Sequence, residues 1–78
     1  MLIEVFGPGC AKCNQSADVA REFLSANAIE GEVVKHTELS TMTDRGVFRT
    51  PTTMIDGEKV VVGRVLREKD LRKWMEKA

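Results

Sequence analysis

Residues 7–13 read Gly-Pro-Gly-Cys-Ala-Lys-Cys, and they are the most informative segment of the chain. They follow a short apolar segment, residues 1–6, and lead into a stretch with helical periodicity. The two cysteines therefore stand at a strand-to-helix turn. The start of a helix carries partial positive charge, which favours a thiolate on the first sulfur and places the second sulfur one turn away. This arrangement favours redox chemistry in which Cys10 attacks and Cys13 resolves.

Two other uses of a cysteine pair fit these residues less well. A structural disulfide across so short a loop removes little unfolded-state entropy, roughly 2 kcal/mol, and small disulfide-stabilised folds use several longer bridges. A structural zinc site needs four ligands, whereas the chain holds two cysteines and one histidine, His36. The spacing is typical of a redox motif.

Length and composition limit the class of protein. A chain of 78 residues buries only about 60 to 65% of its unfolded surface, which predicts one domain over residues 1–78. The 12 basic and 12 acidic side chains balance, so the charge does not favour nucleic acid. The first 43 residues carry net minus three and the others plus three. This asymmetry fits either solvated helix faces or a basic patch that orients an acidic redox partner.

The sequence holds neither an apolar run of about 18 residues nor the basic-then-apolar start of a signal peptide. We therefore expect no membrane association and a cytoplasmic location. In that reducing compartment a Cys-x-x-Cys pair cycles between dithiol and disulfide. We expect a charged domain of this size to be a monomer, and we expect no cofactor.

Residue periodicity predicts seven elements. Those of the first half are a buried central strand (1–6), an amphipathic helix (11–27), an edge strand (32–37) and a short helix (40–47) with Thr41 as its cap and Gly46 as its end. Those of the second half are a hairpin of strands 52–55 and 59–62 around Asp56-Gly57, and a closing helix (68–77) without a favourable N-cap residue.

Three segments carry a family resemblance: residues 7–13, residues 46–51 and residues 55–64. The second ends in Thr-Pro, 38 residues after Cys13 and directly before the hairpin, and this combination is specific because two distant segments must meet at one site. Over nearly the whole chain the sequence resembles the thioredoxin superfamily, in particular its small thioredoxin- and glutaredoxin-like proteins with a Gly-x-Gly-Cys-x-x-Cys loop. The resemblance implies an α/β three-layer sandwich in the order βαβαββα, with a mixed four-stranded sheet ordered 2-1-3-4 and three flanking helices.

The resemblance also implies a thiol-disulfide oxidoreductase that reduces protein disulfides. In this cycle Cys10 forms a mixed disulfide with the substrate and Cys13 displaces the reduced substrate. A thioredoxin-reductase-like protein or another dithiol reductant then reduces the Cys10–Cys13 disulfide. A cis Thr50-Pro51 bond is implied as well, with Thr50 and Pro51 positioning an extended substrate beside Cys10.

Lys12, Glu4 and Arg49 are candidate modulators. Lys12 either adds positive charge near the thiolate or points to solvent. Glu4 stands six residues before Cys10, where thioredoxins carry a buried acid that helps to deprotonate the resolving thiol; the alternative is a structurally paired carboxylate. Arg49 either steers an acidic protein partner or is solvated.

Departures from the better-known relatives bear on the substrate. Gly9 replaces the tryptophan of thioredoxins, and the carboxylate pocket of glutaredoxins looks incomplete around residues 63–66. Protein disulfides are therefore favoured over glutathione, although Arg49 and Arg64 offer a carboxylate another geometry. Two further alternatives are a copper carrier that uses the two thiolates and a non-catalytic interaction module. Copper chaperones usually hold Met at the position of Pro8, and a non-catalytic module needs neither the cysteine pair nor Thr-Pro.

Overall fold

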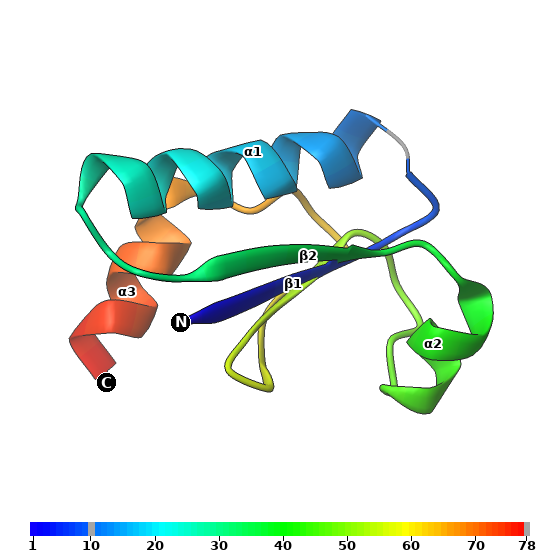
Figure 1. Cartoon of the computed structure of the whole chain (residues 1–78). Coiled ribbons are helices and arrows are strands. Elements are labelled where there is room, and N and C mark those ends of the chain that lie inside the picture. Colours follow the sequence, from blue (N-terminus) through cyan, green and yellow to red (C-terminus); the bar gives the residue numbers. More distant parts are fainter. Residues whose placement is uncertain (10, 78) are drawn as a thin grey trace.

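A four-stranded mixed sheet forms the middle layer of the protein, whose computed structural model describes residues 1–9 and 11–77 (Figure 1). The strands lie in the order β2-β1-β3-β4; β1 runs parallel to β2 and antiparallel to β3, and β3 pairs antiparallel with β4. The predicted sheet order is therefore confirmed. The elements in chain order are β1 (Leu2–Phe6), α1 (Ala11–Ala26), β2 (Glu32–His36), α2 (Leu39–Asp44), β3 (Thr52–Ile55), β4 (Glu58–Val62) and α3 (Glu68–Lys77).

The central strand β1 divides the core into two halves because successive side chains of a strand point to opposite faces of the sheet. Ile3 and Val5 point toward α1 and α3, where they join clusters that include Ala17, Ala20 and Leu71. Figure 1 shows α1 lying across this face. None of the described helices is long and apolar enough to span a membrane.

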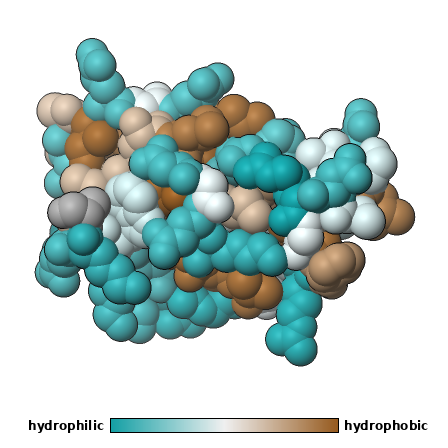
Figure 2. Space-filling model, turned by 90° about the horizontal axis from the view of Figure 1, so that it is seen from below, coloured by the Kyte–Doolittle hydropathy of each residue, from teal (hydrophilic) through white to brown (hydrophobic). Residues whose placement is uncertain are grey.

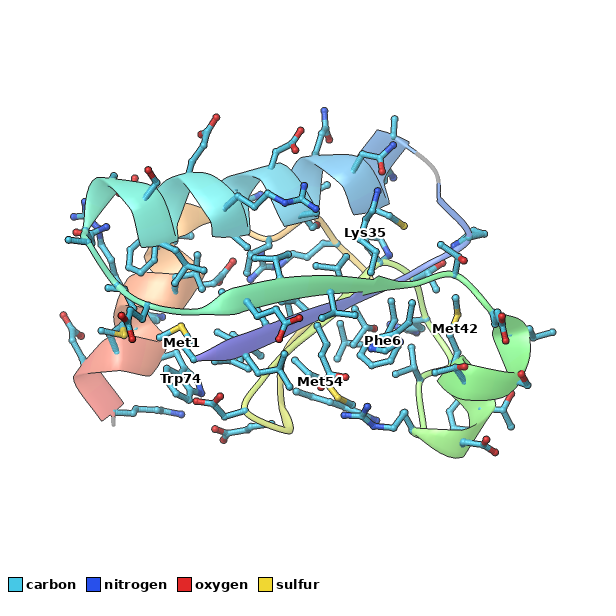
Figure 3. The ribbon with its side chains drawn as sticks, in the orientation of Figure 1. Met1, Phe6, Lys35, Met42, Met54 and Trp74 are labelled. Atoms are coloured by element: carbon cyan, nitrogen blue, oxygen red, sulfur yellow. The ribbon has the colours of Figure 1, made fainter. Side chains whose placement is uncertain are left out.

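The second face of the sheet carries α2. Phe6 of β1, Met54 of β3 and Met42 of α2 form a separate buried cluster with Val47, and Figure 3 shows Phe6, Met42 and Met54 together below β1. Viewed from this side, the molecule presents mostly hydrophilic atoms with apolar patches between them (Figure 2). This face is therefore a smaller apolar core beneath a polar surface.

Helix α1 ends with a left-handed residue that is not glycine. The Ile29 N–H donates to Leu24 O at 2.9 Å and the Ala28 N–H donates to Ser25 O at 3.3 Å, the pair of bonds that defines a Schellman motif. Ala28 occupies the left-handed position with φ of 50°. The helix stop predicted at Asn27 is correct, and the Asn27 amide reinforces it by donating to Phe23 O at 2.9 Å.

Helix α2 is shorter than the predicted helix 40–47 and begins earlier. It spans Leu39–Asp44 with Glu38 at the N-cap, and no side chain caps it, so the prediction that Thr41 is the cap is wrong. Glu38 has the extended backbone that an N-cap position requires. Gly46 does end the helix: its φ is 70°, and the Val47 N–H donates to Met42 O at 2.7 Å.

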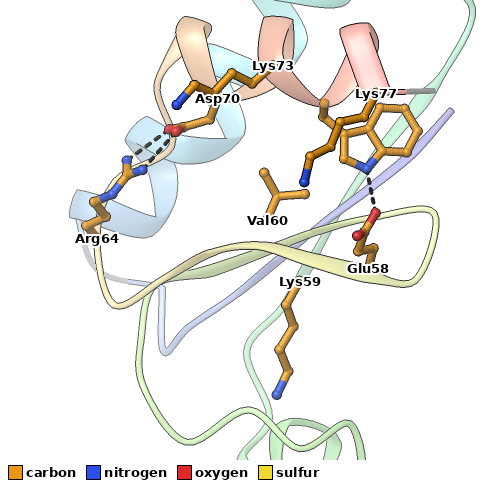
Figure 4. A pocket seen from close by; sticks show the side chains of 8 residues that line it. Glu58, Lys59, Val60, Arg64, Asp70, Lys73 and Lys77 are labelled. Carbon is orange, nitrogen blue, oxygen red and sulfur yellow. Dashed lines mark hydrogen bonds and ion pairs between the residues drawn. The ribbon is translucent and has the colours of Figure 1, made fainter.

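Helix α3 is capped from inside, by a residue that the sequence analysis overlooked. The Asp70 carboxylate accepts a hydrogen bond of 2.9 Å from the backbone N–H of Arg67, the residue directly before the helix. This is the reach-back half of a capping box. Asp70 also binds both guanidinium nitrogens of Arg64, at 2.9 and 2.8 Å (Figure 4). The Trp74 indole N–H donates to Glu58 at 3.1 Å, which joins α3 to β4.

Candidate active site

Cys13 lies in the first turn of α1 and is buried beneath it. Its side chain is 2% exposed and packs with Val5 of β1 and Ala17 of α1. Helical spacing turns Cys13 toward the sheet together with Ala17 and Ala20, which places its sulfur in the layer between α1 and the sheet. Cys10 lies outside the described residues; in the sequence it directly precedes Ala11, where α1 begins.

The backbone at Gly7 passes so close to this sulfur that it leaves no room for a side chain. A Cβ atom at Gly7 would overlap Cys13 Sγ and would stand 3.7 Å from the Cβ of Thr50. The Gly7 N–H is fixed by a 3.0 Å bond to His36 O. The loop after β1 and the first turn of α1 therefore meet a segment from the far half of the chain, the residue before Pro51.

The Thr50–Pro51 peptide bond is cis, the isomer that the resemblance implied. Pro51 is buried while Thr50 is exposed, so the turn presents Thr50 to solvent beside the Cys13 segment. Hydrogen bonds hold both sides of this turn, from the Gly63 N–H to Pro51 O at 2.9 Å and from the Thr52 hydroxyl to Arg49 O at 2.6 Å.

Glu4 lies on the face of the sheet opposite to Cys13, because it alternates with Val5 along β1. Its carboxylate accepts two hydrogen bonds from Arg45, at 2.8 and 2.9 Å, and lies 2.8 Å from the His36 ring nitrogen. The Arg45 guanidinium, followed by His36, holds the pKa of Glu4 below its ordinary value although burial opposes this. These contacts favour the structurally paired alternative for Glu4.

Arg45 and His36 were not singled out as partners in the sequence analysis. Arg45 lies over the Phe6 ring at 5.4 Å from its centroid, and His36 stacks on the same ring at 4.6 Å. The sequence did carry a signal for these partners. Glu4 is an acidic residue inside an apolar strand, and a buried carboxylate requires a charged or hydrogen-bonding partner.

Lys12 and Arg49 are both exposed. Lys12 lies between the cysteines in the sequence, on the outer surface of α1. The Arg49 side chain runs along Gly63, where a Cβ atom would stand 3.5 Å from Arg49 Cδ. The Arg49 side chain therefore lies beside the residue that directly follows β4.

A shallow groove of about 350 Å³ adjoins the cis turn and was not predicted. Two of its apolar side chains stand well out of the protein, Leu39 with 77% and Phe48 with 82% of their surface exposed. The available signal was an aromatic residue in a polar loop. The groove is lined by Pro8, Thr37, Leu39, Met42, Thr43, Val47, Phe48 and Thr50.

A buried cysteine lies in the first turn of the helix after β1, and a glycine of the preceding loop lies close both to this cysteine and to a cis-proline turn from the far half of the chain. On a sheet ordered 2-1-3-4, these features define a class of proteins. That class is the thioredoxin-like proteins. The known proteins agree: the family model described as "Thioredoxin domain" matches residues 1–76, and the chain therefore belongs to the thioredoxin family.

Relatives span almost the whole chain. A thioredoxin of Methanothermobacter thermautotrophicus is 32% identical over 73 residues, covering 94% of this chain and 95% of the relative. A thioredoxin of Methanocaldococcus jannaschii is 32% identical over 65 residues, covering 83% and 74%. The solved structure of thioredoxin 1 from Thermosipho africanus TCF52B, at 22% identity, shares the fold with a TM-score of 0.58 and coverage of 99% and 97%.

Membership of this family makes the chain a thiol-disulfide oxidoreductase that acts on protein disulfides. The relatives do not favour a copper carrier or a glutathione-dependent enzyme.

Proposed function

We propose that this protein reduces protein disulfides through a Cys10–Cys13 dithiol cycle in which Cys10 attacks and Cys13 resolves. The burial of Cys13 carries this assignment: a sulfur that is 2% exposed, between Val5 and the first turn of α1, is inaccessible to a disulfide on another protein. Cys10, one residue before α1, stands where the unpaired backbone N–H groups of a helix start favour a thiolate.

The cycle balances without any external cofactor. The Cys10 thiolate attacks one sulfur of the substrate disulfide, and the other substrate sulfur leaves with the electron pair and takes up a proton. Cys13 then loses its proton and attacks the Cys10 sulfur, so that the Cys10–Cys13 bond forms and the second substrate sulfur leaves as a thiol. A dithiol reductant, such as a thioredoxin-reductase-like protein, returns the pair to the reduced form.

The substrate is an extended apolar segment of a protein that flanks a disulfide. Leu39 and Phe48 support this, because two large side chains exposed by more than three quarters line the same groove as Thr50 and provide apolar contact area for a protein substrate. The groove is continuous with the cis turn through Thr50 and with the cysteine loop through Pro8. At the edge of the groove, Thr50 and Pro51 hold the backbone of the bound segment in an extended conformation, like an additional β-strand.

The modulators have smaller roles in this proposal. Arg49 and Lys12 are exposed, and their positive charges attract acidic protein partners over a distance, an effect that salt weakens. Glu4 stabilises the fold through its hydrogen bonds with Arg45 and His36, which lie on the face of the sheet opposite to Cys13. We further propose that the 78 residues work as one monomeric domain in a reducing, cytoplasmic compartment.

The test is an insulin-reduction assay with dithiothreitol as the reductant. Cys10→Ser is expected to abolish turnover, and Cys13→Ser is expected to trap a covalent complex with insulin through Cys10, detectable by mass spectrometry. If the trapped complex forms through Cys13 in Cys10→Ser instead, the two roles are reversed and the proposal fails.

A second experiment tests the groove. Phe48→Ala is expected to raise KM for insulin several-fold while leaving the reduction of a small aromatic disulfide unchanged, because only the protein substrate reaches the groove. Met75→Ala is the matched control, since Met75 is also a partly exposed apolar residue, at 39%, and lies on α3. Equal KM values for the two variants would contradict the substrate assignment.

A further inference from the structure

The hydroxyl of Thr53 is a buried polar group that the fold does not satisfy. Thr53 is 0% exposed, and its Oγ1 finds no hydrogen-bond partner within residues 1–9 and 11–77. The neighbouring Thr52 hydroxyl, by contrast, donates to Arg49 O. A buried hydroxyl without a partner destabilises a protein relative to an apolar group of the same shape, so its presence calls for an explanation.

The register of the sheet places Thr53 on the same face as Cys13. Thr53 of β3 stands directly opposite Val5 of β1, and residues directly opposite in an antiparallel pair project to the same face about 4.5 to 5.5 Å apart. Val5 in turn packs with Cys13 and Ala17. The hydroxyl therefore belongs to the layer between the sheet and α1 that also contains the Cys13 sulfur.

No charged side chain of the described residues is buried in that layer. The carboxylate of Glu4 is on the other face, bound to Arg45. Asp70 is bound to Arg64 at the start of α3. Two lysines lie on the elements that pack around Cys13. Lys12 of α1 is exposed; Lys35 of β2 stands opposite Val5 on the same face of the sheet, and its ammonium group extends to the exposed surface, where it donates to Asn14.

The other buried hydroxyl of this layer already has a structural task. Ser16, one turn after Cys13 in α1, is 0% exposed, and its Oγ accepts a hydrogen bond of 3.0 Å from the backbone N–H of Leu66. That bond ties α1 to the segment before α3. Thr53 Oγ1, in contrast, makes no hydrogen bond with the described residues, either as donor or as acceptor.

We propose that the Thr53 hydroxyl donates a hydrogen bond to the Cys13 thiolate that forms during the resolving step. This rests on the assignment of Cys13 as the resolving cysteine. Cys13 releases its proton, its sulfur attacks Cys10, the bond between Cys10 and the substrate sulfur breaks, and the leaving sulfur gains a proton from solvent. Thr53 keeps its own proton and turns it toward the anion. A hydrogen bond made to the charged form of a group favours that form.

The test separates this role from a structural one. In a Cys10→Ser background, the Cys13 thiolate is titrated by its ultraviolet absorbance, which requires no access of a reagent to the buried sulfur. Thr53→Val keeps the shape of the side chain and removes the hydroxyl; it is expected to raise the midpoint of the titration by about one pH unit, which is a tenfold change in the ionisation constant. Thr53→Ser restores the hydroxyl and is expected to return the midpoint to that of the parent.

The same variants are compared in urea. Thr53→Val is expected to unfold at the same or a higher urea concentration than its parent, because an unsatisfied buried hydroxyl has been removed, while its resolving step slows about tenfold. An unchanged titration midpoint in Thr53→Val, or a lowered urea midpoint, overturns the proposal. A failure of the proposed Cys10–Cys13 cycle would look different. In that case the Cys10→Ser variant would still reduce insulin, with either threonine or valine at position 53.

Discussion

Gly7→Ala is the sharpest test of the way in which the buried sulfur is seated. The added methyl group would overlap Cys13 Sγ and lie 3.4 Å from Cys13 Cβ, so either the sulfur or the loop after β1 must move. Insertion of a methyl group into a packed site costs about 1 to 3 kcal/mol. For a domain of this size, with a total stability of roughly 4 to 12 kcal/mol, this is a substantial loss.

Urea unfolding of the reduced protein, followed by the fluorescence of the single tryptophan, measures this loss. Trp74 lies on α3 and donates to Glu58 of β4, far from Gly7 in the fold, so its signal reports global unfolding. With a urea dependence of about 1 kcal/mol per molar, the midpoint is expected to fall by about 1 to 3 M.

A double-mutant cycle identifies the cause. If the methyl group collides with the sulfur, Cys13→Ala removes the collision, and Gly7→Ala is expected to cost at least 1 kcal/mol less in that background. Gly57→Ala is the control: nothing lies within 4 Å of a Cβ at Gly57, but its φ is 86°, so it destabilises the fold independently of Cys13. Additive costs for Gly7→Ala and Cys13→Ala would refute the proposed packing.

Three further predictions concern polar contacts and helix ends. Glu4→Gln is expected to cost about 1 to 3 kcal/mol at neutral pH. Because the pKa of Glu4 is lowered from 4.5 in the folded protein, chiefly by Arg45, the stability that it provides is complete above that value and is lost as the pH falls through the folded pKa; a cost that does not shrink at pH values below the folded pKa would contradict this. Asp70→Ala is expected to cost about 0.5 to 2 kcal/mol, measured by urea unfolding against exposed Glu76→Ala, and equal costs would exclude the capping role. Ala28→Gly is expected to raise the free energy of unfolding by up to about 1 kcal/mol, since glycine adopts the left-handed conformation without the steric cost of a side chain; a lower thermal midpoint would contradict it.

The elements near strong local signals could be predicted from the sequence. Asp56-Gly57 fixed the position of the hairpin, because its two residues have φ of 50° and 86° and few other residue pairs tolerate such a turn. The apolar spacing of residues 11–27 similarly predicted α1 and its buried face. The location of Cys13 inside the first turn followed from the same spacing.

The contacts that complete the site could not be predicted in this way, because they join residues that no local pattern relates. Glu4 and Arg45 are 41 residues apart, and the overlap between Gly7 and Cys13 depends on the angle at which α1 crosses β1. The predicted start of α2 was wrong for a different reason. Threonine at position 41 is a favourable N-cap residue, but the apolar contact of Met42 with Phe6 fixes the helix one turn earlier and leaves Glu38 at the cap.

The two faces of the sheet separate the chemistry from the charges. Val5, Thr53 and Cys13 form a neutral layer under α1, whereas Glu4, His36 and Arg45 form a charged network on the face of α2. A carboxylate in the first layer would raise the pKa of the resolving thiol by repulsion, while a hydroxyl lowers it by donation. We therefore infer that Glu4, on the α2 face, contributes part of the loss of stability in acid, beside Asp70, whose pKa is lowered chiefly by Arg64. The pH dependence of the resolving step arises on the α1 face, through Cys13. Measured on the same samples, the two profiles should respond to different substitutions: Glu4→Gln should alter only the first and Thr53→Val only the second.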